Sequence, residues 1–289
     1  MLRSPELFHL LAPAKLNLYL HVLGRIGDYH RLESLVAFTK FGDQLKLSPD
    51  AGISLHIEGP FATQCGPIEE NLVMRAARAL AAYASKSVGA KLTLHKNLPV
   101  ASGLGGGSSD AAAAIRLLIP FWNLDIDAAT ILQVALGLGA DVPVCLRTSP
   151  TLMRGMGEKL CDAPALPPSY VLLVNPGVAL STKAVFEKLD GRFGQMSQPL
   201  PLQICDSKNL LRVLNSRRND LQAAAIELAP EIQTVLDMLS AHRGCLIARM
   251  SGSGPTCFGL FADAGEMAVA AIAIARDKPA YWLAQTRLA

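Results

Sequence analysis

Several features are scarce or missing in this sequence, and each absence narrows what the chain can be. The formal net charge is only +3 and no cluster of basic residues occurs, which gives little support to a nucleic-acid partner. The longest apolar run, Met267 to Ala275, is far shorter than the roughly 18 residues that a membrane helix needs. The N-terminus has an acidic residue early and no signal-peptide core, so no membrane or secretory segment is expected.

Cysteine usage and composition point to an intracellular globular protein. The six cysteines are scattered without a Cys-x-x-Cys pair, which favours reduced, mostly buried thiols in a cytoplasmic protein over a zinc site or a disulfide framework. No low-complexity segment, charge block or internal repeat is present. With 51% hydrophobic residues in 289 positions, we expect a substantial core and about two domains or lobes.

The glycine-rich stretch at residues 103–110 is the most informative part of the sequence. Lys91 to His95 before it alternates as a strand does, and the run from Ala111 to Leu118 after it predicts a helix stopped by Pro120. Ser108, Ser109 and Asp110 are preferred N-cap residues for that helix. Four glycines in five residues let backbone N–H groups and the positive end of the helix dipole converge on one point. A phosphate chain is the expected occupant.

Two common phosphate motifs do not match this stretch. A P-loop needs Lys after its last glycine, and Ser108 follows Gly107 here. The dinucleotide fingerprint fails as well, since the third glycine position counted from Gly103 is again Ser108. A flexible linker or an ordinary tight turn is the remaining alternative, but linkers are seldom placed between a strand and a capped helix.

An alternating segment near the N-terminus predicts a strand with an unusual polar face. In Pro13 to Val22 the leucines point one way, while Lys15, Asn17, Tyr19 and His21 point the other. This face is either solvent-exposed in an antiparallel sheet or part of a site. Further strands are predicted at 35–38, 44–47 and 53–58, and a helix at 70–86. Strands followed by helices indicate an α+β first lobe.

Asp141 follows a predicted helix over residues 127–136 and two glycines. Pro143 biases Val142 away from helical geometry, so Val142 to Leu146 is expected to be extended, with Asp141 on the bend. A carboxylate at a bend is either a turn former or a general base.

The second half of the chain predicts another α+β lobe beyond a boundary in the Gly- and Pro-rich segment 154–169. Strands are expected at 170–174, 245–250, 257–260 and 281–285, and helices at 182–189, 219–228, 230–239 and 264–276. Ser251-Gly252-Ser253-Gly254-Pro255-Thr256 is a second turn of small residues. Alone it is a hairpin turn; together with the first turn it suggests a ligand held between lobes.

These motifs together resemble the GHMP small-molecule kinases over nearly the full length. The matching blocks are Pro13 to Leu18, Pro99 to Ala111, Gly139 to Pro143 and Ser251 to Thr256. The Gly-Gly-Gly-Ser-Ser-Asp version is most similar to the branch whose substrate is a cytidine-diphosphate-linked methylerythritol, in the non-mevalonate route to isoprenoids. The resemblance implies an α+β, two-lobed architecture with the active site in the cleft, an ATP-binding lobe at 1–160 and a substrate-binding lobe at 161–289.

By the same resemblance, Lys15 and Asp141 match the catalytic pair. ATP is implied at Pro99, Val100, Ala101, Ser102, Gly103, Leu104, Gly105, Gly106, Gly107, Ser108 and Ser109. The small-molecule substrate with its cytidine diphosphate group is implied at Asn17, Tyr29, His30, Thr182, Phe186, Gly252, Ser253 and Gly254. Mg²⁺ is expected, with no ligand assigned. The family pattern has Asp-Gly before Tyr-His, whereas this chain has Gly27-Asp28 in a loop one residue shorter.

Two other functions are compatible with the sequence at this point. Another GHMP enzyme acting on a smaller alcohol would not need Tyr29, His30 and Phe186. A non-catalytic nucleotide-binding protein on the same scaffold would be expected to have lost Lys15 or Asp141, and this chain has both.

Overall fold

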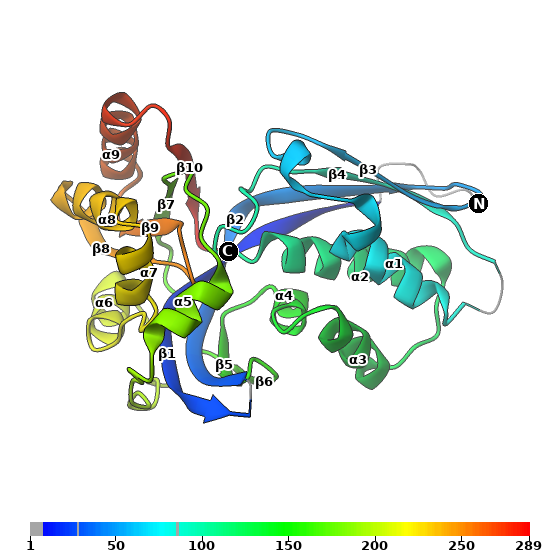
Figure 1. The fold of residues 1–289 in the computed structure, drawn as a ribbon, viewed down its shortest axis with the longest axis horizontal. Helices are drawn as coiled ribbons and strands as arrows, with labels where there is room; N and C mark the ends of the chain where they lie inside the picture. The colour runs from blue at the N-terminus through cyan, green and yellow to red at the C-terminus, as the bar shows by residue number, and fades with distance from the viewer. Residues whose placement is uncertain (1–7, 28, 85–86) are drawn as a thin grey trace. The chain divides into compact units, whose positions relative to one another are not determined.

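A computed structural model describes residues 8–27, 29–84 and 87–289 of the chain (Figure 1). The chain forms two compact units, and each is discontinuous in sequence. Unit 1 comprises the chain up to Ala14, Gly42–Val100 and Gly105–Arg147; unit 2 comprises Lys15–Phe41, Ala101–Leu104 and Thr148–Ala289. Two long paired strands, β1 (His9–Ile26) and β2 (Tyr29–Ser48), contribute residues to both units. The division into lobes predicted between residues 160 and 161 concerns ligand-binding roles and stays a prediction.

Unit 1 combines a small sheet with helices. Strand β3 (Ile53–Glu58) runs parallel to β4 (Ala90–His95), and β4 runs antiparallel to residues 44–48 of β2. The helices are α1 (Leu72–Ala81), α2 (Gly106–Trp122), α3 (Ala128–Leu138) and α4 (Val142–Arg147), with short 3₁₀ turns η2 (Ala62–Gln64) and η3 (Ile68–Glu70). Helix α2 packs against α1 and α4, because its run of buried alanines lets neighbouring helices approach closely.

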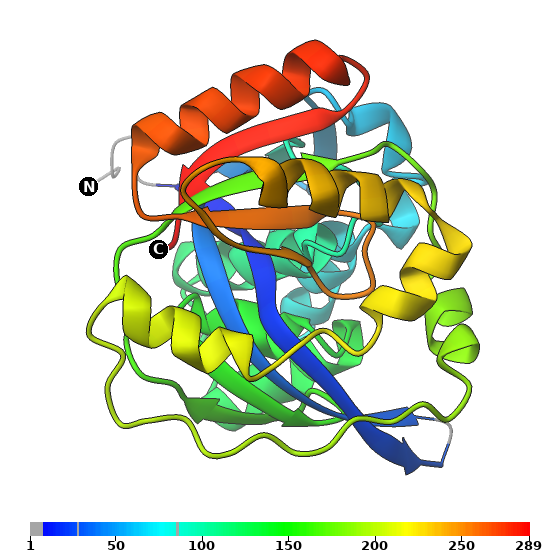
Figure 2. The same cartoon turned by 90° about the vertical axis from the view of Figure 1, so that its left-hand side faces the viewer.

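Unit 2 is built on a four-stranded antiparallel sheet in the order β10 (Trp282–Arg287), β7 (Tyr170–Asn175), β9 (Cys257–Phe261), β8 (Cys245–Met250). Helices α8 (Glu231–Ala241) and α9 (Ala264–Asp277) pack on this sheet (Figure 2). The unit also contains α5 (Thr182–Leu189), α6 (Ser207–Asn215) and α7 (Gln222–Leu228). Strand β5 (Thr151–Gly155) pairs with residues 32–36 of β2 and with β6 (Lys159–Asp162).

The predicted α+β class is confirmed, and the strand over Pro13 to Val22 lies within β1. No helix in the described part of the chain is long and apolar enough to cross a bilayer. Two predicted strands, 35–38 and 44–47, are one continuous strand, β2, so the break expected between them was wrong. The sequence analysis also missed α6, β5 and β6, the last two in or beside the segment predicted to be irregular.

Three local predictions around the glycine loop and Asp141 were wrong. The N-cap of α2 is Gly105 with φ +62°, and Ser108 to Asp110 lie inside the helix, because a left-handed residue starts the helix earlier than side-chain capping would. The helix continues past Pro120 to Trp122, since a proline so near the end removes only one backbone hydrogen bond. Val142 to Leu146 is helical in α4, with Pro143 in the first turn, where no N–H is needed.

Candidate active site

The polar face of β1 holds Lys15 and Asn17 in a fixed orientation. The Lys15 ammonium donates to Asn17 Oδ1 at 3.2 Å, and Asn17 Nδ2 donates to Ser34 Oγ at 2.8 Å. The Ser34 hydroxyl donates its single proton to the Tyr19 carbonyl oxygen at 2.6 Å, so toward Asn17 it acts as the acceptor. This chain of bonds turns the Asn17 oxygen toward Lys15. Both residues are buried, with Lys15 4% and Asn17 1% exposed.

The second small-residue turn lies against this face. Ser251 Oγ accepts from the Asn17 backbone N–H at 3.2 Å and donates to the Gly103 carbonyl oxygen at 3.0 Å. Gly103 has φ +79°, and a Cβ there would lie 2.4 Å from the Ser251 carbonyl oxygen, so only glycine fits. The Lys15 N–H donates to the Leu104 carbonyl oxygen at 2.8 Å. Within unit 2 the structure therefore brings together parts of three of the four predicted sequence blocks.

Asn219, which the sequence analysis did not single out, holds the second turn from the other side. Its Nδ2 donates to the carbonyl oxygens of Met250 at 2.9 Å and Gly252 at 2.8 Å. Its Oδ1 accepts from the Leu221 N–H at 3.0 Å. Gly252 has φ +57°, a conformation that favours glycine. An Asn-Asp pair ahead of a helix was the only sequence signal for this role, and it also fits an ordinary cap.

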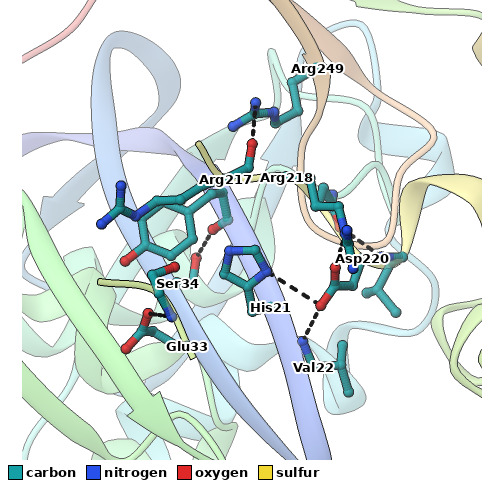
Figure 3. A network of polar contacts seen from close by, with 12 residues as sticks. His21, Val22, Glu33, Ser34, Arg217, Arg218, Asp220 and Arg249 are labelled. Atoms are coloured by element: carbon teal, nitrogen blue, oxygen red, sulfur yellow. Dashed lines mark hydrogen bonds and ion pairs between the residues drawn. The ribbon is translucent and has the colours of Figure 1, made fainter. Parts of the chain in front are cut away.

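Beside Asn219, the carboxylate of Asp220 ties β1 to the segment before α7 (Figure 3). It accepts from the Val22 N–H at 2.9 Å, from His21 Nδ1 at 3.4 Å and from Arg218 Nε at 2.7 Å. Burial pushes the pKa of Asp220 upward, but these three hydrogen bonds together outweigh it and hold the pKa below its usual value. The carboxylate is therefore ionised at neutral pH.

Two buried arginines surround the middle of β1. Arg249 donates to the Arg217 carbonyl oxygen at 2.9 Å (Figure 3). It also donates to the carbonyl oxygens of Leu18 at 2.6 Å and Leu214 at 3.1 Å. Burial lowers the pKa of Arg249 to about 10, which still leaves it charged at neutral pH. The Arg217 guanidinium lies 5.3 Å from the centre of the Tyr19 ring. These contacts hold β1 against the segment that carries Leu214 and Arg217.

The residues predicted to hold the cytidine lie partly together in unit 2. The rings of His30 and Phe186 stack with their centres 4.6 Å apart, and the Thr182 and Ser253 hydroxyls are 2.8 Å apart. Burial, followed by the charge of Arg25, lowers the pKa of His30, so its ring is neutral at physiological pH. Tyr29 is 65% exposed. Gly254 has φ +81° and, like Gly252, shapes the turn that carries Ser253.

The predicted phosphate loop is divided between the units: Ala101–Leu104 belong to unit 2, and the chain from Gly105, which leads into α2, belongs to unit 1. Pro99 and Val100 precede the loop, and Gly105 starts the helix; Ser109 N–H donates back to the Gly105 carbonyl oxygen at 2.9 Å. The N–H groups of Gly106, Gly107 and Ser108 therefore lie in the first turn, where no helical acceptor exists. Ala101 and Ser102 lie in unit 2, where Ser102 O accepts from Thr256 N at 3.1 Å. The first turn of α2 can accept an anion.

Asp141 directly precedes α4 in unit 1, and its carbonyl oxygen accepts the first helical bond, from Cys145 N at 3.2 Å. Its side chain is half-buried. Lys15 belongs to unit 2, so the catalytic pairing of the two stays a prediction. Within residues 8–27, 29–84 and 87–289, no group of three or more His, Cys, Asp or Glu side chains could hold a metal ion.

Comparisons with known proteins place these features in a family context. Residues 71–149 match the model of the GHMP kinases N-terminal domain, and residues 206–277 match that of the GHMP kinases C-terminal domain. A 4-diphosphocytidyl-2-C-methyl-D-erythritol kinase from Paramagnetospirillum magneticum is 47% identical, over 97% of this chain and 98% of that protein. One of the same name from Paracoccus denitrificans is 49% identical, over 96% of each.

Solved structures agree with these relatives. A crystal structure of 4-(cytidine 5'-diphospho)-2C-methyl-D-erythritol kinase superposes with a TM-score of 0.78 at 33% identity, covering 97% of this chain and 98% of that one. Homoserine kinase from Cytophaga hutchinsonii has a TM-score of 0.69 at 18% identity, with 99% and 97% covered. The second similarity concerns the fold alone.

Proposed function

The chain belongs to the GHMP kinases, in the family of the 4-diphosphocytidyl-2-C-methyl-D-erythritol kinases, and from this premise we propose that it phosphorylates that substrate with ATP. The acceptor is the 2-hydroxyl of 4-diphosphocytidyl-2-C-methyl-D-erythritol, in the non-mevalonate route to isoprenoid precursors. The observation that carries the proposal is the junction in unit 2, where Lys15, Asn17, Gly103 and the turn at Ser251 are joined by hydrogen bonds.

Phosphoryl transfer needs an aligned hydroxyl and neutralisation of the charge that develops on the transferred group. We assign Asp141 as the base that accepts the proton of the substrate hydroxyl. Lys15, oriented by Asn17 Oδ1, stabilises negative charge on the transferred group. The N–H groups at the start of α2 hold ATP phosphates, together with the segment Pro99 to Ser109.

For the cytidine, we assign Phe186, Tyr29, His30 and Thr182. The Phe186 ring already stacks with the ring of His30, which supports a role for Phe186 in stacking with a planar group. Thr182, which lies one helical turn before Phe186 in α5, forms a hydrogen-bonding pair with the Ser253 hydroxyl. Asn17 and the turn from Gly252 to Gly254 would lie against the substrate phosphates.

Mg²⁺ belongs to this proposal as the partner of the ATP phosphates. The described residues offer no cluster of three ligating side chains, so a metal site built by the protein alone does not fit them. Mg²⁺ in kinases is commonly bound largely through the substrate phosphates. We therefore assign it no protein ligand. The cytoplasmic location expected from the sequence stays a prediction.

The decisive experiment incubates the purified protein with ATP and Mg²⁺ and a panel of alcohols with and without the cytidine diphosphate group. Phosphorylation of 4-diphosphocytidyl-2-C-methyl-D-erythritol, with little turnover of free methylerythritol, homoserine or mevalonate, is the expected result. Preferential turnover of a small alcohol would support another GHMP enzyme. ATP binding without phosphorylation of any alcohol in the panel would support a non-catalytic protein and overturn the proposal.

A further inference from the structure

Three ionisable side chains form a buried cluster beneath the first turn of α2. Lys96 Nζ lies 2.5 Å from Asp43 Oδ2 and 2.8 Å from Asp110 Oδ2. All three residues are almost fully buried, with exposures of 3% or less. They come from three elements of unit 1: Asp43 from β2, Lys96 from the end of β4 and Asp110 from α2. We call these three residues the Lys96 cluster.

The cluster connects the backbone before the glycine loop with the backbone after it. Asp43 Oδ1 accepts from the N–H groups of Asn97 at 2.6 Å and Leu98 at 2.9 Å, which fixes the chain as it leaves β4. Asp110 lies four residues into α2, after the loop. A Cβ on Gly106, the first residue of α2, would lie 3.4 Å from both Asp43 Oδ2 and Lys96 Nζ. The first turn of α2 therefore rests directly on the cluster.

The charges of the cluster do not balance if both carboxylates are ionised. Burying a charge without a partner is costly, and here one ammonium faces two carboxylates. Asp110 Oδ1 is buried and has no hydrogen-bond partner, so an ionised carboxylate would keep part of its charge unsatisfied there, whereas a neutral carboxyl loses less by this burial. Burial raises the pKa of Asp110 well above its usual range; Lys96 opposes this and Asp43 adds to it. Although burial lowers the pKa of Lys96, the two carboxylates outweigh it and keep the ammonium charged.

We propose that the Lys96 cluster is a positioning device for the phosphate-binding turn of α2, and that ATP binds more weakly once Asp110 loses its proton. This inference rests on the proposed binding of ATP phosphates at that turn. With Asp110 protonated the cluster is neutral; with Asp110 ionised it carries one net negative charge close to the ATP phosphates. That charge opposes the attraction of the helix N-terminus.

Asp110 is the group around the cluster to which a weakening of ATP binding at alkaline pH is assigned, and its titratable neighbours are as follows. Asp43 and Lys96 are the charged groups that face Asp110 from β2 and from the end of β4. Cys65, which follows η2, interacts electrostatically with all three members of the cluster. Burial raises the pKa of the Cys65 thiol above its usual value, which moves its ionisation further into the alkaline range. Because Asp110→Asn leaves Cys65 unchanged, that variant separates the two groups. Alkaline weakening of ATP binding is therefore assigned to Asp110.

The test measures ATP affinity by calorimetry at about pH 7 and about pH 9, without any alcohol substrate. For the wild type we expect the dissociation constant to rise by up to about tenfold, the equivalent of one pKa unit of coupling. For Asp110→Asn, which keeps the shape but cannot ionise, we expect a ratio near one between the two pH values. Asp127→Asn, an exposed cap of α3 in the same unit, is the control and should retain the wild-type ratio.

A second pair of variants tests the positioning role. Lys96→Met should raise the KM for ATP much more than it lowers kcat, and Lys96→Arg should recover part of the affinity, since it restores a cation between the carboxylates. Two results would overturn the inference. One is the same ratio of ATP dissociation constants between the two pH values in the wild type and in Asp110→Asn. The other is unchanged ATP affinity in folded Lys96→Met. If Lys96→Met does not fold, the inference is tested by comparing the pH dependence of ATP affinity in the wild type and in Asp110→Asn. Because only ATP is present in the binding test, its result does not depend on which alcohol the enzyme phosphorylates.

Discussion

The hydroxyl of Ser251 donates to the carbonyl oxygen of Gly103 at 3.0 Å, across 148 positions of sequence. The Ser251 hydroxyl oxygen also accepts a hydrogen bond from the backbone N–H of Asn17. One side chain therefore joins β1, the entry to the glycine loop and the second small-residue turn, all within unit 2. This junction makes the second turn more than a hairpin, because its position fixes that of Lys15 through Asn17.

Ser251→Ala should weaken this junction. It leaves the Asn17 N–H and the Gly103 carbonyl without their partner, at a cost of about 1–3 kcal/mol in unfolding free energy. Because Asn17 orients Lys15, kcat should fall as well. Ser169→Ala is the matched control, since that buried hydroxyl donates to the Pro167 carbonyl oxygen away from β1. Urea unfolding and steady-state kinetics measure the two effects. A loss of kcat no larger than that of Ser169→Ala would contradict the role of the junction.

Lys15 and Asp141 should act as a unit in catalysis. Asp141→Asn should lower kcat by roughly 10²–10⁴, the usual range for loss of a general base, with little change in substrate affinity. Lys15→Ala should also lower kcat, and adding it to Asp141→Asn should do little further harm. A double-mutant cycle on kcat measures the coupling between them. Additive losses would exclude the pair, and a fully active Asp141→Asn enzyme would remove the base.

Phe186→Ala should affect the cytidine substrate rather than ATP. If cytosine stacks on this ring, its loss should cost on the order of 1–3 kcal/mol of substrate binding. The KM for the cytidine substrate should rise, while that for ATP stays close to the wild-type value. Phe193→Ala is a useful control, since Phe193 meets His30 edge-on, with ring centres 6.4 Å apart, and is not predicted to stack on the base. Equal changes in both KM values would argue for the small-alcohol alternative.

Asp220→Asn should reduce stability more at neutral pH than in acid. The pKa of Asp220 is lowered in the folded protein, so the folded state binds fewer protons than the unfolded state near pH 4. The stabilisation is therefore present above about pH 4, the unfolded pKa, and is lost as the pH falls through the folded pKa. We expect a loss of about 1–3 kcal/mol at neutral pH from the weakened contacts with Val22, His21 and Arg218.

Unfolding in urea at neutral pH and near pH 3 measures this difference. Asp237→Asn, on the exposed side of α8, provides the control and should change stability little at either pH. The difference in stability between the wild type and Asp220→Asn should be smaller at the lower pH. A constant difference between them at both pH values would show that the ionised carboxylate is not what stabilises this network.

The sequence by itself determined the features that depend on local patterns. Alternation over Pro13 to Val22 placed Lys15 and Asn17 on one face of a strand, because successive side chains of a strand point in opposite directions. The glycines at 103–107 indicated a phosphate loop before a helix, since few other residues tolerate the required backbone. The order of these blocks was enough to identify the family.

Only the tertiary structure decided how distant polar groups compensate one another. The members of the Lys96 cluster are far apart in the sequence: 67 positions separate Asp43 from Asp110. No periodic pattern relates these residues. Asn219 and Arg249 likewise donate hydrogen bonds to backbone carbonyl oxygens that no side-chain pattern in the sequence predicts. Buried charges and amides must be paired wherever the chain places them, and the partner is set by packing rather than by sequence distance. For the same reason the start of α2 at Gly105 followed from a backbone angle and not from the capping residues Ser108 and Ser109.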